Sequence, residues 1–448
     1  MAAVEELRAS LGDGRVLTDA DVVDAYRRDE AQLVEPGRPL AVVLARDVGD
    51  VQTTLRWASE HRIPIVARGA GSGLSGGATA TEGCVVLSLA RMTAIVEVNV
   101  DDQLAVVEPG VINADLQKAA AAHGLMFPPD PASFEISTIG GNIATNAGGL
   151  RCVKYGVTRE SVLGLEVVLA DGRLLKSGHR TVKGVAGYDL TALFVGSEGT
   201  LGIVTQATVK LRAKPQSEPV TVVGVFATLP AAGQAVNDVM RAGLQPSLLE
   251  LMDQATIRAV DDWKHVGLDR DAAAMLIAQV DVDHPRDPAQ AIEKAFLEAG
   301  ATYTAVSSDA VEAAELLGVR RMTHWATERL GKILTEDVGV PRSKLAQMLA
   351  RIEEIAREFR VVIATVGHAG DGNLHPSIVI DSERALPAAE AVYRAALDFG
   401  GTITGEHGIG VLKRDWLPAE IGEVGMDVQR AVKKTFDPLG ILNPGKAI

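Results

Sequence analysis

The stretch that decides the fold is RGAGSGLSGGA, residues Arg68–Ala78. It carries five glycines between residues 69 and 77, with the apolar run PIVA before it and CVVLSLA after it. Glycine permits positive φ angles and a close backbone approach, so successive N–H groups can converge on an anion. A Rossmann-type dinucleotide turn fits poorly, because the third glycine is misplaced and no helical pattern follows. The stretch therefore predicts a loop that wraps a diphosphate rather than a plain turn.

Two later stretches have the same character. They are DPASFEISTIGGNIATNAGG at residues 130–149 and VGSEGTLGIVT at residues 195–205. Long loops of glycine and small polar residues inside a compact, strand-rich region are usually functional. Hydroxyl and amide contacts to a ligand are expected from the polar residues of the first of these loops, Thr138, Asn142, Thr145 and Asn146.

The segments around these loops alternate between strand and helix patterns. PLAVVLA, DVGDVQTTLRWASEHR and IPIVARGA predict a β-α-β unit after a helical lead-in at residues 1–37. Asp171-Gly172 predicts a tight hairpin turn. The polar segment AKPQSEP, residues 213–219, predicts a domain boundary. The pattern beyond it predicts an antiparallel sheet with helices on one side, and hence an α+β chain.

Bulk composition excludes several classes of protein. At 448 residues the chain is too long for one ordinary core, and its net charge of −14 argues against nucleic-acid binding. Two cysteines, Cys84 and Cys152, are too few for an iron–sulfur cluster or a cysteine zinc site. The N-terminus has no apolar signal core, and no run of about 18 apolar residues occurs. We expect no transmembrane segment and a cytoplasmic location, at most peripheral to the inner face of the membrane.

Histidines gather near the C-terminus. His368 and His375 flank AGDGN, a turn signal, so a hairpin would bring the two imidazoles together. With Glu406 they would form a His2Glu donor set for a divalent metal; the alternative is that each histidine is a satisfied polar residue at a strand end. His407 follows Glu406 and suits a general base, or else supports the metal ligands.

Taken together, the three glycine-containing motifs resemble the FAD domain of the vanillyl-alcohol oxidase superfamily. With GHAGDGNLH and GEHG they are most similar to its FAD-linked D-2-hydroxyacid dehydrogenase branch, which includes the glycolate oxidase FAD subunit and D-lactate dehydrogenase (cytochrome). The resemblance runs from about Pro39 to the C-terminus. It implies a PCMH-type FAD-binding domain of two subdomains at residues 38–215, a cap domain at 216–410 and a segment at 411–448 that returns to the FAD domain.

The resemblance also assigns the sites. No histidine stands in the first loop, so FAD should be bound non-covalently. His368, His375 and Glu406 should bind zinc, manganese or iron. Arg320 should clamp the substrate carboxylate, with Arg321 as the fallback, although most helical arginines are surface charges. The residues expected to bind FAD are Arg68, Gly69, Ala70, Gly71, Ser72, Gly73, Leu74, Ser75, Gly76, Pro131, Thr138, Gly141, Asn142, Thr145, Asn146, Glu198, Gly199, Ile203 and Asn443.

The implied activity is oxidation of a small D-2-hydroxy acid, D-lactate or glycolate, to the 2-oxo acid. Members specific for dicarboxylates carry a lysine near the position of Thr335, whereas here the nearest is Lys332, which favours a monocarboxylate. Electrons would pass from FAD to an external cytochrome, quinone, electron-transfer flavoprotein or iron–sulfur subunit. The alternatives are a non-catalytic FAD-binding subunit of a multisubunit glycolate oxidase and a transferase resembling alkyl-glycerone-phosphate synthase. A homodimer is compatible with the sequence.

Overall fold

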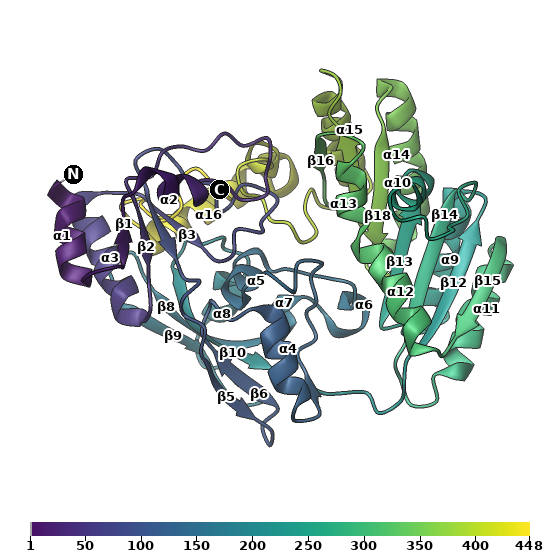
Figure 1. The fold of residues 1–448 in the computed structure, drawn as a ribbon, viewed down its shortest axis with the longest axis horizontal. Coiled ribbons are helices and arrows are strands. Elements are labelled where there is room, and N and C mark those ends of the chain that lie inside the picture. The colour runs from purple at the N-terminus through teal and green to yellow at the C-terminus, as the bar shows by residue number, and fades with distance from the viewer. Residues whose placement is uncertain (1) are drawn as a thin grey trace. The chain divides into compact units, whose positions relative to one another are not determined.

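The computed structural model describes residues 2–448 and divides the chain into two compact units (Figure 1). The first unit comprises the residues up to Gly148, then Gly156–Lys214 and Glu406–Ile448. The second unit comprises Gly149–Tyr155 and Pro215–Gly405. Helices and antiparallel sheets occur together, so the predicted α+β class is confirmed. The chain leaves the first unit within the polar segment AKPQSEP and returns to it after Gly405.

One sheet of the first unit has the strand order β1-β2-β4-β3. Its strands are β1 (Val16–Leu17), β2 (Ala41–Leu44), β4 (Val85–Ser88) and β3 (Ile65–Arg68). Helix α3 (Val48–His61) connects the parallel neighbours of β4, which confirms the predicted β-α-β unit. The lead-in contains α1 (Ala2–Leu11) and α2 (Ala20–Ala25), but also β1, which pairs with β2. Two residues are too few to show a strand period, so the sequence does not predict β1.

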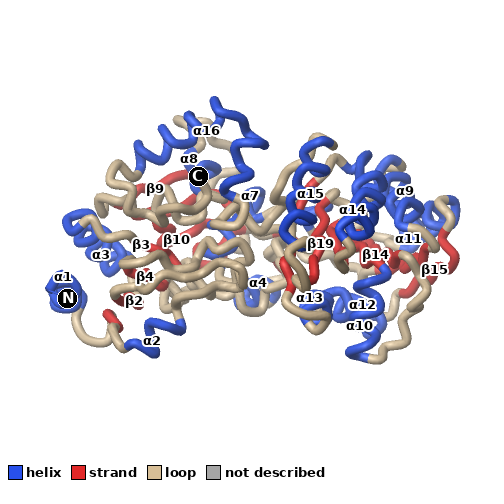
Figure 2. The backbone as a smooth tube through the Cα atoms, turned by 90° about the horizontal axis from the view of Figure 1, so that it is seen from above, coloured by secondary structure: helices blue, strands red, loops and turns tan. Residues whose placement is uncertain are grey.

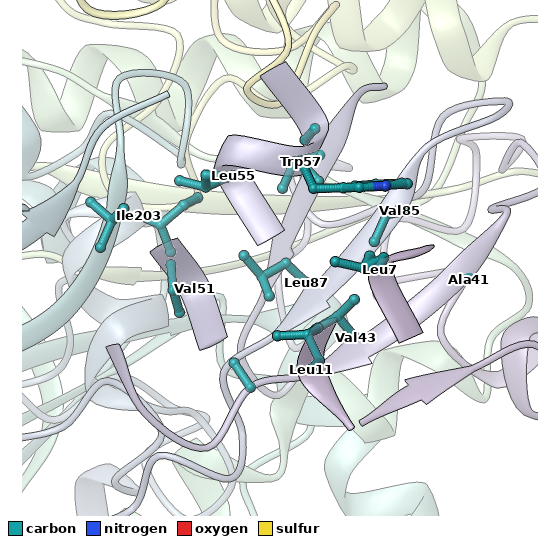
Figure 3. Close-up of a cluster of buried hydrophobic side chains, with 14 of the residues drawn as sticks. Leu7, Leu11, Ala41, Val43, Val51, Leu55, Trp57, Val85, Leu87 and Ile203 are labelled. Atoms are coloured by element: carbon teal, nitrogen blue, oxygen red, sulfur yellow. The ribbon is translucent and has the colours of Figure 1, made fainter. Parts of the chain in front are cut away.

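Apolar side chains fill the space between α3 and this sheet (Figure 3). Leu55 and Trp57 of α3 belong to the same buried cluster as Val85 and Leu87 of β4. Full burial of each such side chain contributes about 1.5–3 kcal/mol. The end of β3, where the glycine-rich loop begins, is therefore anchored on a packed core.

The other main sheet of the first unit has the order β5-β6-β10-β8-β9 and is antiparallel. Its strands are β5 (Ile95–Asn99), β6 (Leu104–Val107), β10 (Ile203–Lys210), β8 (Val162–Val168) and β9 (Leu174–Gly178). The predicted hairpin is confirmed, because β8 pairs with β9 and Gly172 has a φ of 81°. Buried residues of this sheet share a core with the helices α4 (Asn113–Ala121), α5 (Ile139–Thr145) and α8 (Leu190–Phe194).

The second unit is built on an antiparallel sheet of order β15-β12-β14-β13-β18-β19-β16, with β17 beside β19. Its strands are β15 (Ala301–Ser307), β12 (Val220–Phe226), β14 (Ala274–Val280), β13 (Leu248–Asp253), β18 (Ile363–His368), β19 (Asn373–Val379), β16 (Ile333–Thr335) and β17 (Val338–Gly339). Every residue of β12, β13, β14 and β19 is buried.

Helices cover both faces of this sheet, so the prediction of helices on one side is wrong (Figure 2). On one face, Val223 and Met252 pack with side chains of α10 (Gln254–Lys264), α12 (Ala310–Arg321) and α13 (Thr323–Glu328). On the other, the ring of Phe226 lies 5.9 Å from that of Phe296 in α11 (Arg286–Glu298). The helices α9 (Leu229–Arg241), α14 (Leu345–Phe359) and α15 (Ala385–Asp398) also lie on this second face (Figure 2). Runs such as VTVVGVF do not alternate, as expected for strands buried on both sides.

The C-terminal segment packs back onto the first unit. Helix α16 (Leu417–Phe436) brings Phe436 to 5.3 Å from the ring of Phe194, and the N–H of Ile65 donates to the carbonyl of Ile441. Among residues 2–448, no helix is both long and apolar enough to cross a membrane.

Candidate active site

The glycine-rich loop that follows β3 presents unbonded backbone donors. Across the described chain, the N–H groups of residues 70–77 find no hydrogen-bond acceptor, whereas the flanking Ala78 N–H donates to Asp29. The loop is partly exposed between Ala70 and Leu74, and Gly71 and Gly76 have φ angles of 79° and 84°. Successive free N–H groups on a loop with left-handed residues form a nest for a phosphate. The loop therefore has the backbone geometry that the sequence analysis predicts for an anion-binding loop.

Arg68 supports this loop from inside the unit. Its guanidinium is buried, donates to the carbonyl of Arg28 at 2.7 Å and lies 5.8 Å from the centre of the Tyr26 ring. Burial lowers the pKa of Arg68, and the nearby Asp29 carboxylate opposes that effect. A side chain at Gly71 would come within 2.0 Å of the guanidinium, so glycine is required there.

The second predicted loop leads into α5 and touches the glycine-rich loop. Thr138 caps the helix, since its hydroxyl accepts from the N–H of Gly141 at 3.2 Å. A Cβ atom on Gly69 would lie 2.3 Å from that hydroxyl, so the two loops are in contact. The amide oxygen of Asn142 accepts from the side chain of Asn113 at 3.0 Å. The side chains of Thr138 and Asn142 thus form hydrogen bonds that stabilise the conformation of the loop.

Asn146 and Thr145, which are also predicted to contact FAD, form side-chain hydrogen bonds to the backbone of the chain. The side-chain oxygen of Asn146, which has a φ of 52°, accepts from the N–H of Arg159 at 2.9 Å. The hydroxyl of Thr145 donates to a carbonyl one turn earlier in α5. Ile203 is 2% exposed and packs in the core of the first unit. The remaining loop positions of this set are Pro131, whose carbonyl closes a turn, and Gly199, which has a φ of 71°.

Glu198 and Asn443 bond to backbone groups of their own unit. The carboxylate of Glu198 is buried and accepts from the N–H groups of Ile409 at 2.8 Å and Gly410 at 2.9 Å. The side-chain amide of Asn443 donates to the carbonyls of Glu198 at 2.7 Å and Gly77 at 2.9 Å. Asn443 therefore ties the C-terminus to the glycine-rich loop.

In the second unit, the hairpin β18–β19 brings the two predicted metal ligands together. His375 lies across from Val366, and His368 lies across from Asn373. The two imidazole rings are buried, and their centres are 5.1 Å apart in an edge-to-face arrangement. The prediction that a turn in AGDGN makes the histidines neighbours is confirmed, and Gly372 has a φ of 79° in that turn.

Glu250 of β13 joins His368 to Arg320. Its carboxylate accepts from Nδ1 of His368 at 2.9 Å, and Nη2 of Arg320 lies 2.8 Å from its other oxygen. Each of the three side chains is at most 6% exposed. The sequence reasoning missed Glu250, although a charged residue inside the apolar run LLELM was an available signal.

Asp337 takes the corresponding place beside His375. Its Oδ1 lies 3.5 Å from Nδ1 of His375 and accepts from the side chain of Asn373 at 2.6 Å. Its other oxygen accepts from the hydroxyl of Thr404 at 2.8 Å. A Cβ atom on Gly405 would lie 2.2 Å from the Asn373 amide, so the chain passes close to this cluster just before Glu406. Sequence reasoning did not assign Asp337 a role.

Arg320 is buried at the C-terminal end of α12 and not solvated, unlike most helical arginines. Its Nη1 donates weakly to the hydroxyl of Thr323 at 3.4 Å. Within residues 2–448, its Nε has no hydrogen-bond acceptor. The fallback, Arg321, is half-buried.

Thr335 stands near the position at which dicarboxylate-specific members carry a lysine. The hydroxyl of Thr335 lies 3.1 Å from that of Ser377 across the strand pair β16–β19, and Lys332 is exposed.

Glu406 and His407 belong to the first unit, directly after Gly405. A Cβ atom on Gly148 would lie 2.3 Å from Oε2 of Glu406. The carbonyl of His407 accepts a hydrogen bond from Ser75 Oγ at 3.2 Å.

The first unit thus contains a loop with unbonded backbone N–H groups, and the second contains two buried imidazoles and a buried arginine. Residues 39–178 match the FAD binding domain family, and residues 214–447 match the C-terminal domain of FAD linked oxidases. The chain belongs to the FAD-linked oxidases, as its sequence motifs predict.

Three relatives cover nearly the whole chain. The glycolate oxidase subunit GlcD of Bacillus subtilis is 44% identical over 97% of this chain and 92% of its own length. The D-lactate dehydrogenase of Archaeoglobus fulgidus is 40% identical, covering 95% of this chain and 96% of the relative. The D-2-hydroxyglutarate dehydrogenase of Stutzerimonas stutzeri is 34% identical, covering 99% and 98%.

Solved structures share the fold. The 4-ethylphenol oxidase of Gulosibacter chungangensis has a TM-score of 0.81 at 21% identity, covering 100% of this chain and 96% of that one. An alkyldihydroxyacetonephosphate synthase has a TM-score of 0.77 at 19% identity, covering 99% and 86%. At these identities the likeness concerns the fold alone.

Proposed function

We propose that this chain oxidises a small D-2-hydroxy acid to the 2-oxo acid and delivers the electrons from FAD to an external acceptor. The observation that carries the proposal is the buried carboxylate of Glu250, which holds an imidazole, His368, and a guanidinium, Arg320, in one place. The three relatives named above act on glycolate, D-lactate and D-2-hydroxyglutarate, which share a carboxylate next to a hydroxyl-bearing carbon.

Arg320 binds the substrate carboxylate in this proposal. A guanidinium presents a planar fork of donors that matches a carboxylate. The Nε of Arg320 has no acceptor among the described residues, and an unmatched buried donor is costly unless a ligand completes it. Thr335 replaces the lysine of dicarboxylate-specific members, and Lys332 is exposed, which favours a monocarboxylate, D-lactate or glycolate.

His368, His375 and Glu406 would hold a divalent cation of the zinc, manganese or iron type. The fit rests on the carboxylates beside the two Nδ1 atoms, Glu250 at 2.9 Å and Asp337 at 3.5 Å, because metal-binding histidines usually donate the second ring N–H to an oxygen. Glu406 follows Gly405, which packs on the Asn373–Asp337 cluster. A bound cation lowers the pKa of a coordinated hydroxyl.

His407 acts as the general base that removes the proton from the C2 hydroxyl. FAD, when bound, accepts the hydride from C2. Residues 70–77 bind its diphosphate through their backbone N–H groups. Because no histidine is present in that loop, the flavin is held non-covalently, and acid precipitation of the protein should leave the yellow colour in the supernatant.

The test is an anaerobic titration of the yellow protein with D-lactate, L-lactate, glycolate and D-2-hydroxyglutarate, following the oxidised-flavin absorbance. We expect rapid bleaching by D-lactate or glycolate, lost after chelation and restored by a divalent metal. Bleaching that survives complete chelation would remove the metal from the proposal. No bleaching by any of the four acids in metal-loaded protein would favour the non-catalytic subunit or the transferase.

A further inference from the structure

The segment that follows His407 is held from one side by Ser75. The Ser75 hydroxyl donates to the carbonyl of Gly408 at 2.9 Å, in addition to its contact with His407. The Ser75 carbonyl accepts from the N–H of Val411 at 2.8 Å. A Cβ atom on Gly410, which has a φ of 52°, would lie 2.0 Å from that carbonyl. Ser75 therefore contacts residues 407–411 through hydrogen bonds of both its side chain and its backbone.

Glu198 holds the same segment from the other side. Its two carboxylate oxygens each accept one backbone N–H, from Ile409 and Gly410. A Cβ atom on Gly408 would lie 3.0 Å from the Glu198 carboxylate, and the φ of 83° at Gly408 also disfavours a side chain. Glu198 is itself in the left-handed region, with a φ of 51°, which costs energy for a residue other than glycine. The path of residues 408–410 is thus set by contacts on both sides.

Burying the charged carboxylate of Glu198 is unfavourable. Burial raises the pKa of Glu198 to about 7, although the N–H groups of Ile409 and Gly410 and the ammonium groups of Lys446 and Lys413 act in the opposite direction. A buried charge that only filled space would be replaced at a gain in stability by an apolar side chain. Two successive N–H groups converging on its oxygens indicate a geometric role instead.

We propose that Glu198 is a positioning residue for His407: by holding the N–H groups of Ile409 and Gly410 it orients the imidazole, and it is not a ligand of FAD. This inference rests on the proposed role of His407 as base. Each carboxylate oxygen of Glu198 already accepts a backbone N–H of the chain, which favours a role in holding the segment over a contact with the flavin. It differs from the prediction made from VGSEG, in which Glu198 binds the cofactor.

The variant Glu198→Gln tests the idea with little change in volume. A glutamine oxygen can accept one of the two N–H groups, but its NH2 group then faces the other donor, so residues 408–410 must shift. A displacement of about 1 Å at a reacting group can cost about 10²-fold in rate. We expect flavin reduction at saturating substrate to slow by about that factor, while the Kd for FAD changes by less than about threefold. The control is Glu166→Gln on β8, a carboxylate of the same unit that bonds to Lys176 at the surface.

A double variant separates positioning from a general structural effect. If Glu198 acts through His407, then Glu198→Gln combined with His407→Ala should be no slower than His407→Ala alone, because residues that act as a unit are not additive. Additive losses, or a large rise in the Kd for FAD with normal reduction once FAD is saturating, would overturn the proposal. If Glu198→Gln does not fold, Ser75→Ala replaces it in the double variant with His407→Ala only, with FAD saturating, because Ser75 also belongs to the loop proposed to bind FAD.

An NMR measurement distinguishes failure of this inference from failure of the proposed function. In histidine-labelled protein, the signal of His407 is identified by its loss in His407→Ala. We expect Glu198→Gln to shift that signal and Glu166→Gln to leave it in place, whether or not any hydroxy acid reduces the flavin. An unmoved His407 signal in Glu198→Gln would refute positioning by itself.

Discussion

Glu250→Gln is the perturbation that tests the centre of the candidate site most directly. The substitution keeps the shape of the side chain, and its amide oxygen can still accept from Nδ1 of His368. It removes the negative charge that faces Nη2 of Arg320 at 2.8 Å. The guanidinium, whose side chain is 5% exposed, then stays buried without a counterion.

The cost follows from that burial. Removing one partner of a buried ion pair costs about 3–5 kcal/mol, because the remaining charge is uncompensated, and the retained shape and hydrogen bond place Glu250→Gln at the lower end, about 3 kcal/mol. Weakening the carboxylate that orients a metal-bound histidine typically lowers metal affinity by about 10–100-fold. Both effects should appear in one variant, since one carboxylate serves both groups.

The assay combines urea unfolding with competition for the metal by a chelator. The matched control is Glu358→Gln in α14, which breaks an ion pair with Arg351 on an exposed surface and should change neither quantity measurably. If Glu250→Gln is too unstable to purify, Glu250→Asp retains the charge at a shorter reach and should lose metal affinity without the full loss of stability. Wild-type stability and metal affinity in Glu250→Gln would refute the reasoning.

Three further predictions follow from single residues. Arg320→Lys should raise the KM for the hydroxy acid by about 10–100-fold with a smaller change in the Kd for FAD, because lysine offers no planar fork; an unchanged KM in steady-state assays would exclude Arg320 as the carboxylate clamp. His375→Ala should lose the metal while retaining FAD, measured by elemental analysis and by the flavin spectrum; equal metal content would place the ligand elsewhere. Asp253, whose carboxylate accepts from the N–H groups of Thr256 and Thr365, has its pKa raised by burial to about 6 from 3.8. The protonated carboxyl of Asp253 stabilises the fold below pH 3.8, and this stabilisation is lost as the pH rises through 6. Between pH 4 and 7 the free energy of unfolding of the wild type should therefore fall by about 3 kcal/mol more than that of Asp253→Asn. Parallel curves of urea stability against pH for the two proteins would contradict this.

Local sequence patterns predicted much of the fold. The β-α-β unit, the Asp171-Gly172 hairpin and the hairpin that joins His368 to His375 all depend on residues close together in the chain, and the structure contains all of them. Glycines at positions with positive φ, such as Gly71 and Gly372, mark the turns because few other residues adopt that backbone. For the same reason the conformation of the glycine-rich loop could be predicted from Arg68–Ala78 alone.

Contacts between residues far apart in the chain could not be predicted from local sequence patterns. Glu250 lies 118 positions before His368, and Glu198 lies 211 positions before Ile409, so no local spacing connects them. The direction of a polar side chain also depends on tertiary packing. The sequence did not indicate that the side chains of Thr138, Asn142 and Glu198 form hydrogen bonds within the protein. The sheet of the second unit shows the same limit, since its apolar runs indicated burial but not the helices that cover each face.

By itself, the sequence determined the α+β class, the family, the glycine-rich nest and the pairing of the two histidines, because backbone conformation and turn chemistry act over a few residues. Only the tertiary structure decided that Glu250 holds both Arg320 and His368, and that Glu198 holds the segment after His407. Those contacts arise when segments from distant parts of the chain pack together and bury a carboxylate, which then accepts hydrogen bonds from the donors that the packing places beside it.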